Sequence, residues 1–253
     1  MSSTETSQKG PLERGLVVLR ALADEPRGLA LVDLARRTGI PTSSLYRILS
    51  ALREAELVEE TASGRYRVGV GALVLARGFL DGLSLRESAL PVLRQLVDET
   101  QETSHLGVLA SPHIVYLEKV DSPLPVRMVS QVGGSNPALT TAIGRALLAH
   151  EHVSVAEQVV EASKRLFGME VDTAELAATL KVTREKGFST DLQENEVGIC
   201  CVAAPVFDAS GRVVAGISVS APAARFAPSQ VDARGERVRD AAAHISRALG
   251  WAG

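Results

Sequence analysis

Three residues of the types used in nucleophilic catalysis occur after residue 100. Cys201 could serve as a nucleophile, His105 as its base and Asp191 as the group that orients the base. The spacing argues against this chemistry, because no helix N-terminus directly follows Cys201 to lower the thiol pKa, and the surrounding strand pattern buries the thiol. A small buried core residue is the more common role of such a cysteine. An enzyme is therefore not expected.

Other chemical sites are also disfavoured. The glycine-containing stretch 133–136 has no following lysine, so it does not match a phosphate-binding loop. The chain has no C-x-x-C or H-x-x-x-H spacing for zinc, and His150 and His152 are better explained as solvated residues at a helix end. Cys200 and Cys201 are adjacent, which excludes a disulfide framework and favours a reducing cytoplasm. No cofactor or metal is expected.

A different kind of chemistry is indicated by Thr42, Ser43 and Ser44, followed by Tyr46 and Arg47. Small polar side chains at a helix N-terminus allow that helix to enter the DNA major groove, about 12 Å wide, and to contact base edges. The same N-terminus offers backbone N–H groups and the positive end of the helix dipole to phosphate. These residues are candidate DNA contacts, although Tyr46 could equally pack between helices.

The elements that position these residues are short helices. Apolar residues recur with helical periodicity over Gly15–Ala23 and again from Leu31. Gly39 lies where a left-handed residue ends a helix, and Ile40–Ser44 begins a third helix. The apolar face of the third helix comprises Leu45, Ile48, Leu49 and Leu52. Two short helices joined by a tight glycine turn are a helix-turn-helix pattern.

A β-hairpin is predicted directly after this pattern. Leu57–Glu60 and Arg65–Val68 alternate around a turn at Thr61–Gly64. A hairpin in this position is a wing, which places Arg65 and Arg67 to reach phosphate or the minor groove.

Two alternatives remain open for this region. Arg36 on the second helix is either a phosphate contact or ordinary solvated surface. Three helices and a hairpin could also form a protein-interaction adaptor. The charge distribution permits DNA binding without requiring it, since residues 1–80 hold 11 Lys and Arg against 9 Asp and Glu, and the remainder holds 16 against 21.

The bulk properties are those of a soluble protein. A length of 253 residues suits one large or two modest domains, and the composition is 45% hydrophobic and 23% charged. No apolar run is long enough to span a membrane. Residues 1–9 are polar and lack the apolar region of a signal peptide, so a disordered tail is expected. We predict a winged helix-turn-helix domain over 10–70.

Two further helices are predicted at 70–80 and 83–100, and we assign 71–100 to linker helices. The second has one apolar stripe, consisting of Leu85, Leu90, Leu93, Leu96 and Val97. A long amphipathic connector is also a suitable dimer-forming element.

The remaining residues, 101–253, show a mixed α+β pattern. Strands are predicted at 105–110, 114–120, 127–132, 188–192, 202–208 and 213–220, and helices at 139–150, 173–186 and 229–249. Helices grouped around an antiparallel sheet give an α+β domain, and small-molecule sites in such domains open between the sheet and its covering helices.

The stretch Lys186–Asp208, followed by Gly211–Pro222, resembles the signature of the IclR family of regulators, and Ala142–Ala149 resembles a second recurrent motif of that family. With the winged helix-turn-helix ahead of them, three ordered motifs cover nearly the whole chain from about Gly10. The resemblance implies a repressor or activator of transcription that binds a double-stranded DNA operator as a homodimer or homotetramer. It also implies a GAF-like C-terminal domain that senses a small-molecule effector.

Carried over residue by residue, the family's effector pocket corresponds to Met128, Ala142, Ile143, Asp191, Ile199, Cys201, Ser218 and Ser220. Ser218 and Ser220 lie two apart on a strand and face the same side, where their hydroxyls can donate to a carboxylate. Asp191 can accept from a ligand hydroxyl but would repel a nearby carboxylate, and the three larger apolar members would form a wall. Alternate serines can also simply cover a sheet face. Ala142-Ile143 stands where some relatives have Gly-Ala, which bears on pocket size. We expect a carboxylic or aromatic acid.

Overall fold

The computed structural model describes residues 10–80 and 84–253, and the chain divides into two compact units with a boundary between residues 82 and 83. We call them the N-terminal unit and the C-terminal unit, and each is described by itself. The predicted disordered tail, residues 1–9, lies outside the described residues. Within them, no helix combines the length and the apolar character that crossing a membrane requires.

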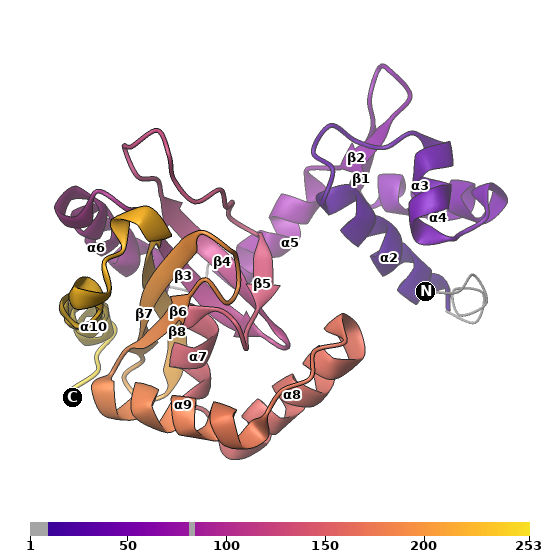
Figure 1. Ribbon diagram of the computed structural model, residues 1–253. Helices are drawn as coiled ribbons and strands as arrows, with labels where there is room; N and C mark the ends of the chain where they lie inside the picture. Colours follow the sequence, from indigo (N-terminus) through magenta and orange to yellow (C-terminus); the bar gives the residue numbers. More distant parts are fainter. Residues whose placement is uncertain (1–9, 81–83) are drawn as a thin grey trace. The chain divides into compact units, whose positions relative to one another are not determined.

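The N-terminal unit is a winged helix-turn-helix followed by one more helix (Figure 1). Its elements are α2 (Pro11–Ala23), α3 (Leu31–Thr38), α4 (Thr42–Glu54), β1 (Val58–Glu60), β2 (Tyr66–Val68) and α5 (Gly71–Leu80). Gly39 ends α3 with φ 68°, as its position in the sequence predicts. The hairpin pairs Val58 with Val68 and Glu60 with Tyr66.

The core of this unit joins all three helices to the wing. Buried apolar residues from each element form one cluster, including Val18, Leu22, Leu34, Leu45, Leu49 and Val58. An isolated bridge between Leu29 and Tyr66, with N···O distances of 2.8 Å in both directions, ties the loop between α2 and α3 to the wing. Gly28 has φ 75°, and a β-carbon there would lie 2.7 Å from the Tyr66 carbonyl oxygen, so this junction requires glycine.

The C-terminal unit is built on a six-stranded antiparallel sheet of strand order β5-β4-β3-β8-β7-β6. The strands are β3 (Thr103–Ala110), β4 (His113–Val120), β5 (Ser135–Pro137), β6 (Ser189–Leu192), β7 (Ile199–Phe207) and β8 (Val213–Pro222). The helices are α6 (Ser84–Thr100), α7 (Ala142–Leu148), α8 (Val153–Phe167), α9 (Thr173–Lys186) and α10 (Val231–Ala248), with 3₁₀ turns η1 (Ala223–Arg225) and η2 (Pro228–Gln230).

Helices cover both faces of this sheet (Figure 1). Residues of α6 and α10, among them Leu93 and Val238, pack with Leu106 and Ile217 on one face. Residues of α7, α8 and α9, among them Ile143, pack on the other face with alternate residues of β4 and β7. The predicted α+β architecture with an antiparallel sheet is therefore correct.

The expectation that 84–100 belongs to a linker is wrong. Leu85, Leu93 and Leu96 are at most 2% exposed and are part of the core beneath the sheet, so α6 is a structural helix of the C-terminal unit. The same burial removes the Leu85–Val97 stripe as a dimer seam, because these side chains are already covered within one chain. Helical periodicity marks an apolar stripe but does not say whether a sheet or a second chain covers it.

Two other predictions differ from the structure. Residues 127–132 were predicted as a strand, yet they lie in an irregular loop, and the edge strand is β5 at Ser135–Pro137. In this loop Val129 is 91% exposed and Val132 is 55% exposed, so the β-branched residues that suggested a strand have no sheet to pack on. Helix α8 was not anticipated.

Candidate functional site

The outward face of α4 is the centre of the candidate DNA interface. Leu45 and Leu49 bury the opposite side of this helix. With 3.6 residues per turn, the side chains on the side away from that core include Ser43, Arg47, Ser50 and Glu54, and all four are exposed. Among the described residues, Arg47 has no hydrogen-bond or ion-pair partner. Its guanidinium is therefore available to an external acceptor.

The first turn of α4 is open. Pro41 is the N-cap residue and gives no side-chain cap, while the Ser44 N–H donates to the Pro41 carbonyl oxygen at 3.0 Å. Thr42 and Ser43 are exposed at the first two helical positions. Their N–H groups precede the first intrahelical hydrogen bond, so they are directed toward solvent or an anion such as phosphate.

Tyr46 lies on the flank of α4 that is nearer the wing. Its side chain is 60% exposed, and it lines a surface hollow together with Arg53, Glu60 and Tyr66. Arg53 Nη1 and Glu60 Oε2, 2.8 Å apart, join the helix to the wing beside it. Tyr46 therefore presents most of its ring to the outside at the junction of helix and wing.

The other predicted arginine contacts already have partners within the chain. Arg36 lies 3.5 Å from Asp33 and remains 77% exposed. Arg67 is paired with Glu59 on the neighbouring strand. Arg65 donates from Nε to the Gly28 carbonyl oxygen at 3.0 Å, which supports the bridge between loop and wing. On DNA, Arg36 and Arg67 would have to share or exchange these partners, and Arg65 would have only its terminal nitrogens to offer.

In the C-terminal unit, five of the carried-over residues lie on one face of the sheet, namely Asp191, Ile199, Cys201, Ser218 and Ser220. The register places Asp191 opposite Cys201, Cys201 opposite Ser220, and Ser220 opposite Thr103. Directly opposite residues project to the same face. They form a continuous polar row across β6, β7, β8 and β3, and we call it the Asp191 row.

A second row lies two residues further along the strands. It pairs Ser189 with Ala203, Ala203 with Ser218, and Ser218 with His105. Ser189 Oγ already donates to the Ala142 carbonyl oxygen at 2.5 Å, so its hydroxyl is committed to α7. His105 and Ser218 are the polar pair of this row, which we call the His105 row.

Both ends of this polar region are held by further hydrogen bonds. Asp191 Oδ1 accepts from the N–H groups of Glu194 at 2.8 Å and Asn195 at 3.2 Å. Burial raises the Asp191 pKa above its ordinary value. At the other end, His105 is 0% exposed, with Nε2 2.7 Å from Ser130 Oγ and Nδ1 3.5 Å from Ser218 Oγ. Burial, with a smaller contribution from Lys119, lowers the His105 pKa to about 3, so the imidazole is neutral.

The thiol of Cys201 is unsuited to nucleophilic chemistry. Burial, assisted by the nearby Asp191 carboxylate, raises its pKa to about 12. At neutral pH the thiol is protonated, because Ser220 lowers its pKa by less than burial and Asp191 raise it. Within the described residues, no group of three or more potential ligands is arranged to hold a metal ion.

The apolar members of the carried-over set pack around the same rows with one difference. Ala142 and Ile143 on α7 belong to the cluster that contains Cys201, and Ile199 packs against it. Met128 is 4% exposed but lies on the loop of residues 121–134, outside that cluster. This loop is connected to the polar rows through Ser130, which contacts His105. Seven of the eight carried-over residues thus lie on or against one face of the sheet, and Met128 lies on an adjoining loop.

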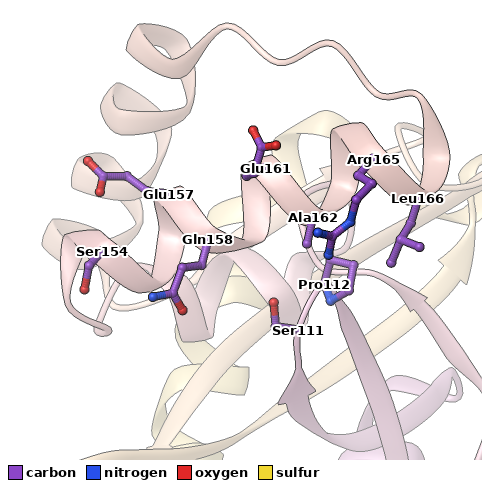
Figure 2. Close-up of a pocket in the computed structure, with 9 residues that line it drawn as sticks. All are labelled: Ser111, Pro112, Ser154, Glu157, Gln158, Glu161, Ala162, Arg165 and Leu166. Atoms are coloured by element: carbon purple, nitrogen blue, oxygen red, sulfur yellow. The ribbon is translucent and has the colours of Figure 1, made fainter. Parts of the chain in front are cut away.

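The eight carried-over residues are largely covered, and the open surface hollows are elsewhere. Figure 2 shows a hollow of about 610 Å³ between the Ser111–Pro112 turn and α8, with Arg165 extending toward Pro112. None of the predicted site residues lines it. A ligand that reaches the polar rows would therefore have to displace covering chain, for which the irregular loop 121–134 is the adjoining segment.

Sequence reasoning missed several residues that these two sites contain. Ser50 shares the outward face of α4, one turn after Arg47, and helical spacing alone could have identified it. Thr103 shares the polar face of β3 with His105, which the sequence suggested only as a catalytic base, and the alternation of a strand predicts this shared face once the strand begins at Thr103. Ser130 could not be found in this way, since its position depends on an irregular loop.

Comparison with known proteins agrees with this geometry. Residues 11–62 match the IclR helix-turn-helix domain, and residues 78–247 match the C-terminal domain of the bacterial transcriptional regulator IclR. The chain is 34% identical over 238 residues to the HTH-type transcriptional regulator KdgR of Escherichia coli, covering 92% of this chain and 90% of that protein. It is 35% identical over 243 residues to the glycerol operon regulatory protein of Streptomyces griseus, covering 94% and 96%.

A solved structure described as a putative IclR transcriptional regulator from Silicibacter sp. is similar throughout. The TM-score is 0.79 at 26% identity, covering 96% of this chain and 97% of that chain. These relatives are transcriptional regulators and not enzymes. The chain belongs to the IclR family of bacterial transcriptional regulators, and it is a DNA-binding regulator of transcription.

Proposed function

We propose that the protein binds its operator by inserting α4 into the major groove as part of a homodimer, and that a small acid bound on the sheet of the C-terminal unit changes its affinity for DNA. The observation that carries the proposal is the outward face of α4. Ser43, Arg47 and Ser50 project from the helix side opposite the core, and the first-turn N–H groups are not capped by a side chain. Base edges and phosphates are the acceptors that such a face matches.

A small-molecule role for the C-terminal unit is supported by its buried polar rows. Asp191, Ser218 and Ser220 are each at most 3% exposed. Hydroxyl and carboxyl groups collected on one sheet face beneath covering helices can orient a small polar ligand. Such a ligand alters DNA affinity only if it binds two arrangements of the protein with different affinities.

Self-association is supported by apolar surface on the N-terminal unit. Val70 at the start of α5 and Leu73, Val74 and Leu75 within it are each at least 60% exposed. A groove of about 620 Å³ between α2 and α4 also contains exposed Leu12 and Leu16, but Ser44 and Arg47 of the candidate DNA interface line it too, so we do not assign it to the dimer. Exposed apolar residues gathered on one helix, as on α5, mark an interaction site. We therefore place the dimer contact on this unit, in place of the α6 stripe.

A gel-shift experiment tests the proposal as a whole. The full-length protein is titrated against DNA from its own gene neighbourhood and against a scrambled duplex of the same composition, with and without a panel of carboxylic and aromatic acids. We expect specific retardation of the neighbourhood DNA, shifted at least about tenfold in protein concentration by one class of acid, the range of a typical allosteric coupling. Equal binding to both duplexes would contradict operator recognition, and specific binding that no acid alters would contradict effector control.

A further inference from the structure

We propose that the groove between α2 and α4 of the N-terminal unit is a ligand site, which takes an amphipathic carboxylic acid and excludes DNA while it is filled. The apolar body of the acid lies between the two helices, and its carboxylate lies at Ser44 and Arg47, which line the groove. The site is separate from the sheet of the C-terminal unit. Only its effect on DNA rests on the proposed function, because that effect requires α4 to be the helix that contacts DNA.

The walls of the groove are apolar. Its volume of about 620 Å³ is within the range of small-molecule sites, about 300–1,000 Å³. The apolar lining residues recur with helical spacing, at Leu12, Leu16 and Leu19 on α2 and at Ile48 and Leu52 on α4. Leu12 and Leu16 are 79% and 50% exposed, whereas the other three pack partly against the core of the unit. An apolar ligand in the groove therefore removes exposed leucine surface from water.

Gly15 leaves the floor of the groove open. It lies inside α2 and is buried, yet a β-carbon built on it would meet no atom within 4 Å beyond its own stretch of helix. Packing therefore does not require glycine here, although glycine destabilises a helix interior relative to alanine. The open floor is space that a ligand can use. It also provides a position from which the groove can be filled by substitution.

The polar residues that line the groove favour an anion. They are Arg14, Ser44 and Arg47, and none of the described residues that line the groove is acidic. Ser44 and Arg47 are three residues apart on α4, so they are neighbours on the helix surface, and neither side chain has a partner within the described part of the chain. Glu13 on α2 accepts from the Gly10 N–H at 3.4 Å. A guanidinium and a hydroxyl can both donate to one carboxylate, which is therefore favoured over an uncharged head group.

A filled groove competes with DNA for Arg47. This side chain belongs to the outward face of α4, and Ser44 lies in the first turn of the same helix. A guanidinium that is bound to a carboxylate cannot at the same time donate to the edge of a guanine. The acid thus lowers DNA affinity by direct competition, whereas an effector on the sheet of the C-terminal unit must act through two arrangements of the protein.

Calorimetric titration of the full-length protein without DNA tests for the site. The probe is octanoate. Octan-1-ol is the analogue that lacks the charge, and butanoate is the analogue that lacks most of the apolar body. We expect octanoate to bind about tenfold or more tightly than either analogue, because one analogue loses hydrogen bonds to a charged group and the other loses apolar contact.

Matched variants locate the bound octanoate. Gly15→Leu fills the floor of the groove and should weaken octanoate binding at least about tenfold, whereas Ala23→Leu, at an exposed position of the same helix, should not. Arg47→Ala should reduce the preference for octanoate over octan-1-ol to within about threefold. Arg36→Ala on α3, where the side chain is 77% exposed, should retain that preference. Leu16→Glu, on the exposed rim, replaces Gly15→Leu if that variant does not fold.

Gel shifts then test the competition. Octanoate at ten times its dissociation constant should raise the protein concentration that retards the neighbourhood DNA about tenfold. The combination of Ser218→Ala and Ser220→Ala should bind octanoate and show this shift like the wild type, because the groove does not include the C-terminal unit. Gly15→Leu should bind the same DNA without responding to octanoate.

Four outcomes overturn the inference. Octanoate does not bind, Gly15→Leu and Arg47→Ala bind it with wild-type affinity and preference, or octanoate and DNA bind together. The fourth is release of the 26.7 kDa monomer by octanoate in sedimentation, which would show that a second copy of the chain occupies the groove. A protein that binds octanoate in the groove but binds neighbourhood and scrambled DNA equally would contradict the proposed function while supporting the ligand site.

Discussion

Ile143 lies directly over Gly216. A β-carbon placed on Gly216 would come within 3.1 Å of Ile143 Cγ2, and one placed on Gly107 would come within 3.3 Å of Ile143 Cδ1. Gly107 and Gly216 are paired on β3 and β8, two residues beyond His105 and Ser218. The isoleucine thus fills the space that two glycines leave at the end of the polar rows. We propose that the size of this residue limits the candidate site in this direction.

Replacement of Ile143 by alanine should therefore destabilise the protein and enlarge the site. We expect a loss of about 2–4 kcal/mol in the free energy of unfolding, measured in urea, because a buried side chain leaves a cavity. We also expect binding of acids with one additional ring or branch. Gly216→Ala should destabilise by about 1–3 kcal/mol through overpacking, and the double variant should be less destabilised than the sum of the two. Additive effects would show that the two residues do not share this contact.

The two serines carried over from the family provide the second prediction. Ser218→Ala combined with Ser220→Ala should abolish the acid response in the gel shift while leaving operator binding without acid nearly intact, because both hydroxyls lie in the C-terminal unit. Ser229→Ala, exposed on η2, should respond like the wild type. A double variant that still responds at the same acid concentration places the site elsewhere.

Local sequence patterns predicted the helices and strands of this fold better than they predicted what each helix or strand packs against. The apolar spacing of Leu45 and Leu49 identified α4 and its buried face, and the glycines at 39 and 187 marked helix ends that the structure contains. The stripe at Leu85–Val97 was just as clear, yet its burial against a sheet rather than a second chain depends on long-range packing. Periodicity contains no information on that choice.

In the candidate site, too, the local features could be predicted from the sequence and the long-range contacts could not. Ser218 and Ser220 could be assigned to one face because strand alternation is local. Their pairing with His105 and Cys201 is a matter of strand order, and β8 lies between β3 and β7, which are distant in sequence. Ser130 contacts His105 from a loop that β-branched residues had suggested was a strand. Contacts of this kind follow from the tertiary fold and have no sequence pattern of their own.

A buried ion pair supports the loop 121–134 and gives the third prediction. Arg225 Nε and Nη2 donate to Glu102 Oε1 and Oε2, both at 2.7 Å, and Nη2 also donates to the Val126 carbonyl oxygen at 2.9 Å. The Glu102 side chain is 4% exposed, so Arg225→Met leaves a buried carboxylate without its partner. We expect a loss of about 3 kcal/mol in unfolding free energy.

Adding Glu102→Gln to Arg225→Met removes the unpaired charge and should recover at least half of that loss. Urea unfolding of the two single variants and the double variant measures the coupling. Limited proteolysis should show faster cleavage near residue 126 in Arg225→Met than in the wild type, because the loop loses a hydrogen bond. If the double variant is as unstable as Arg225→Met, the charge is not the cause.

The fourth prediction concerns self-association. Leu73→Glu combined with Leu75→Glu places two carboxylates on exposed apolar positions of α5, which are 66% and 67% exposed in one chain. The free energy of unfolding should change little, whereas the dimer should weaken at least about tenfold. Sedimentation at micromolar concentration should then show the 26.7 kDa monomer. Val182→Glu on α9, 49% exposed, is the control and should leave the dimer intact. A double variant that still sediments as a dimer would place the contact elsewhere.

Arg47 provides the most direct test of DNA recognition. It lies on the side of α4 opposite Leu45 and Leu49 and has no partner among the described residues, so its replacement should leave the fold unchanged. A bidentate contact to guanine in the major groove predicts that Arg47→Ala weakens specific binding by about 1–3 kcal/mol. Arg47→Lys keeps the charge but loses the planar fork, so it should restore non-specific binding and not specificity. Arg94→Ala, exposed on α6, is the matched control. Gel shifts at several salt concentrations measure the operator affinity and its salt dependence. If Arg47→Ala changes neither quantity, Arg47 is not part of the DNA interface.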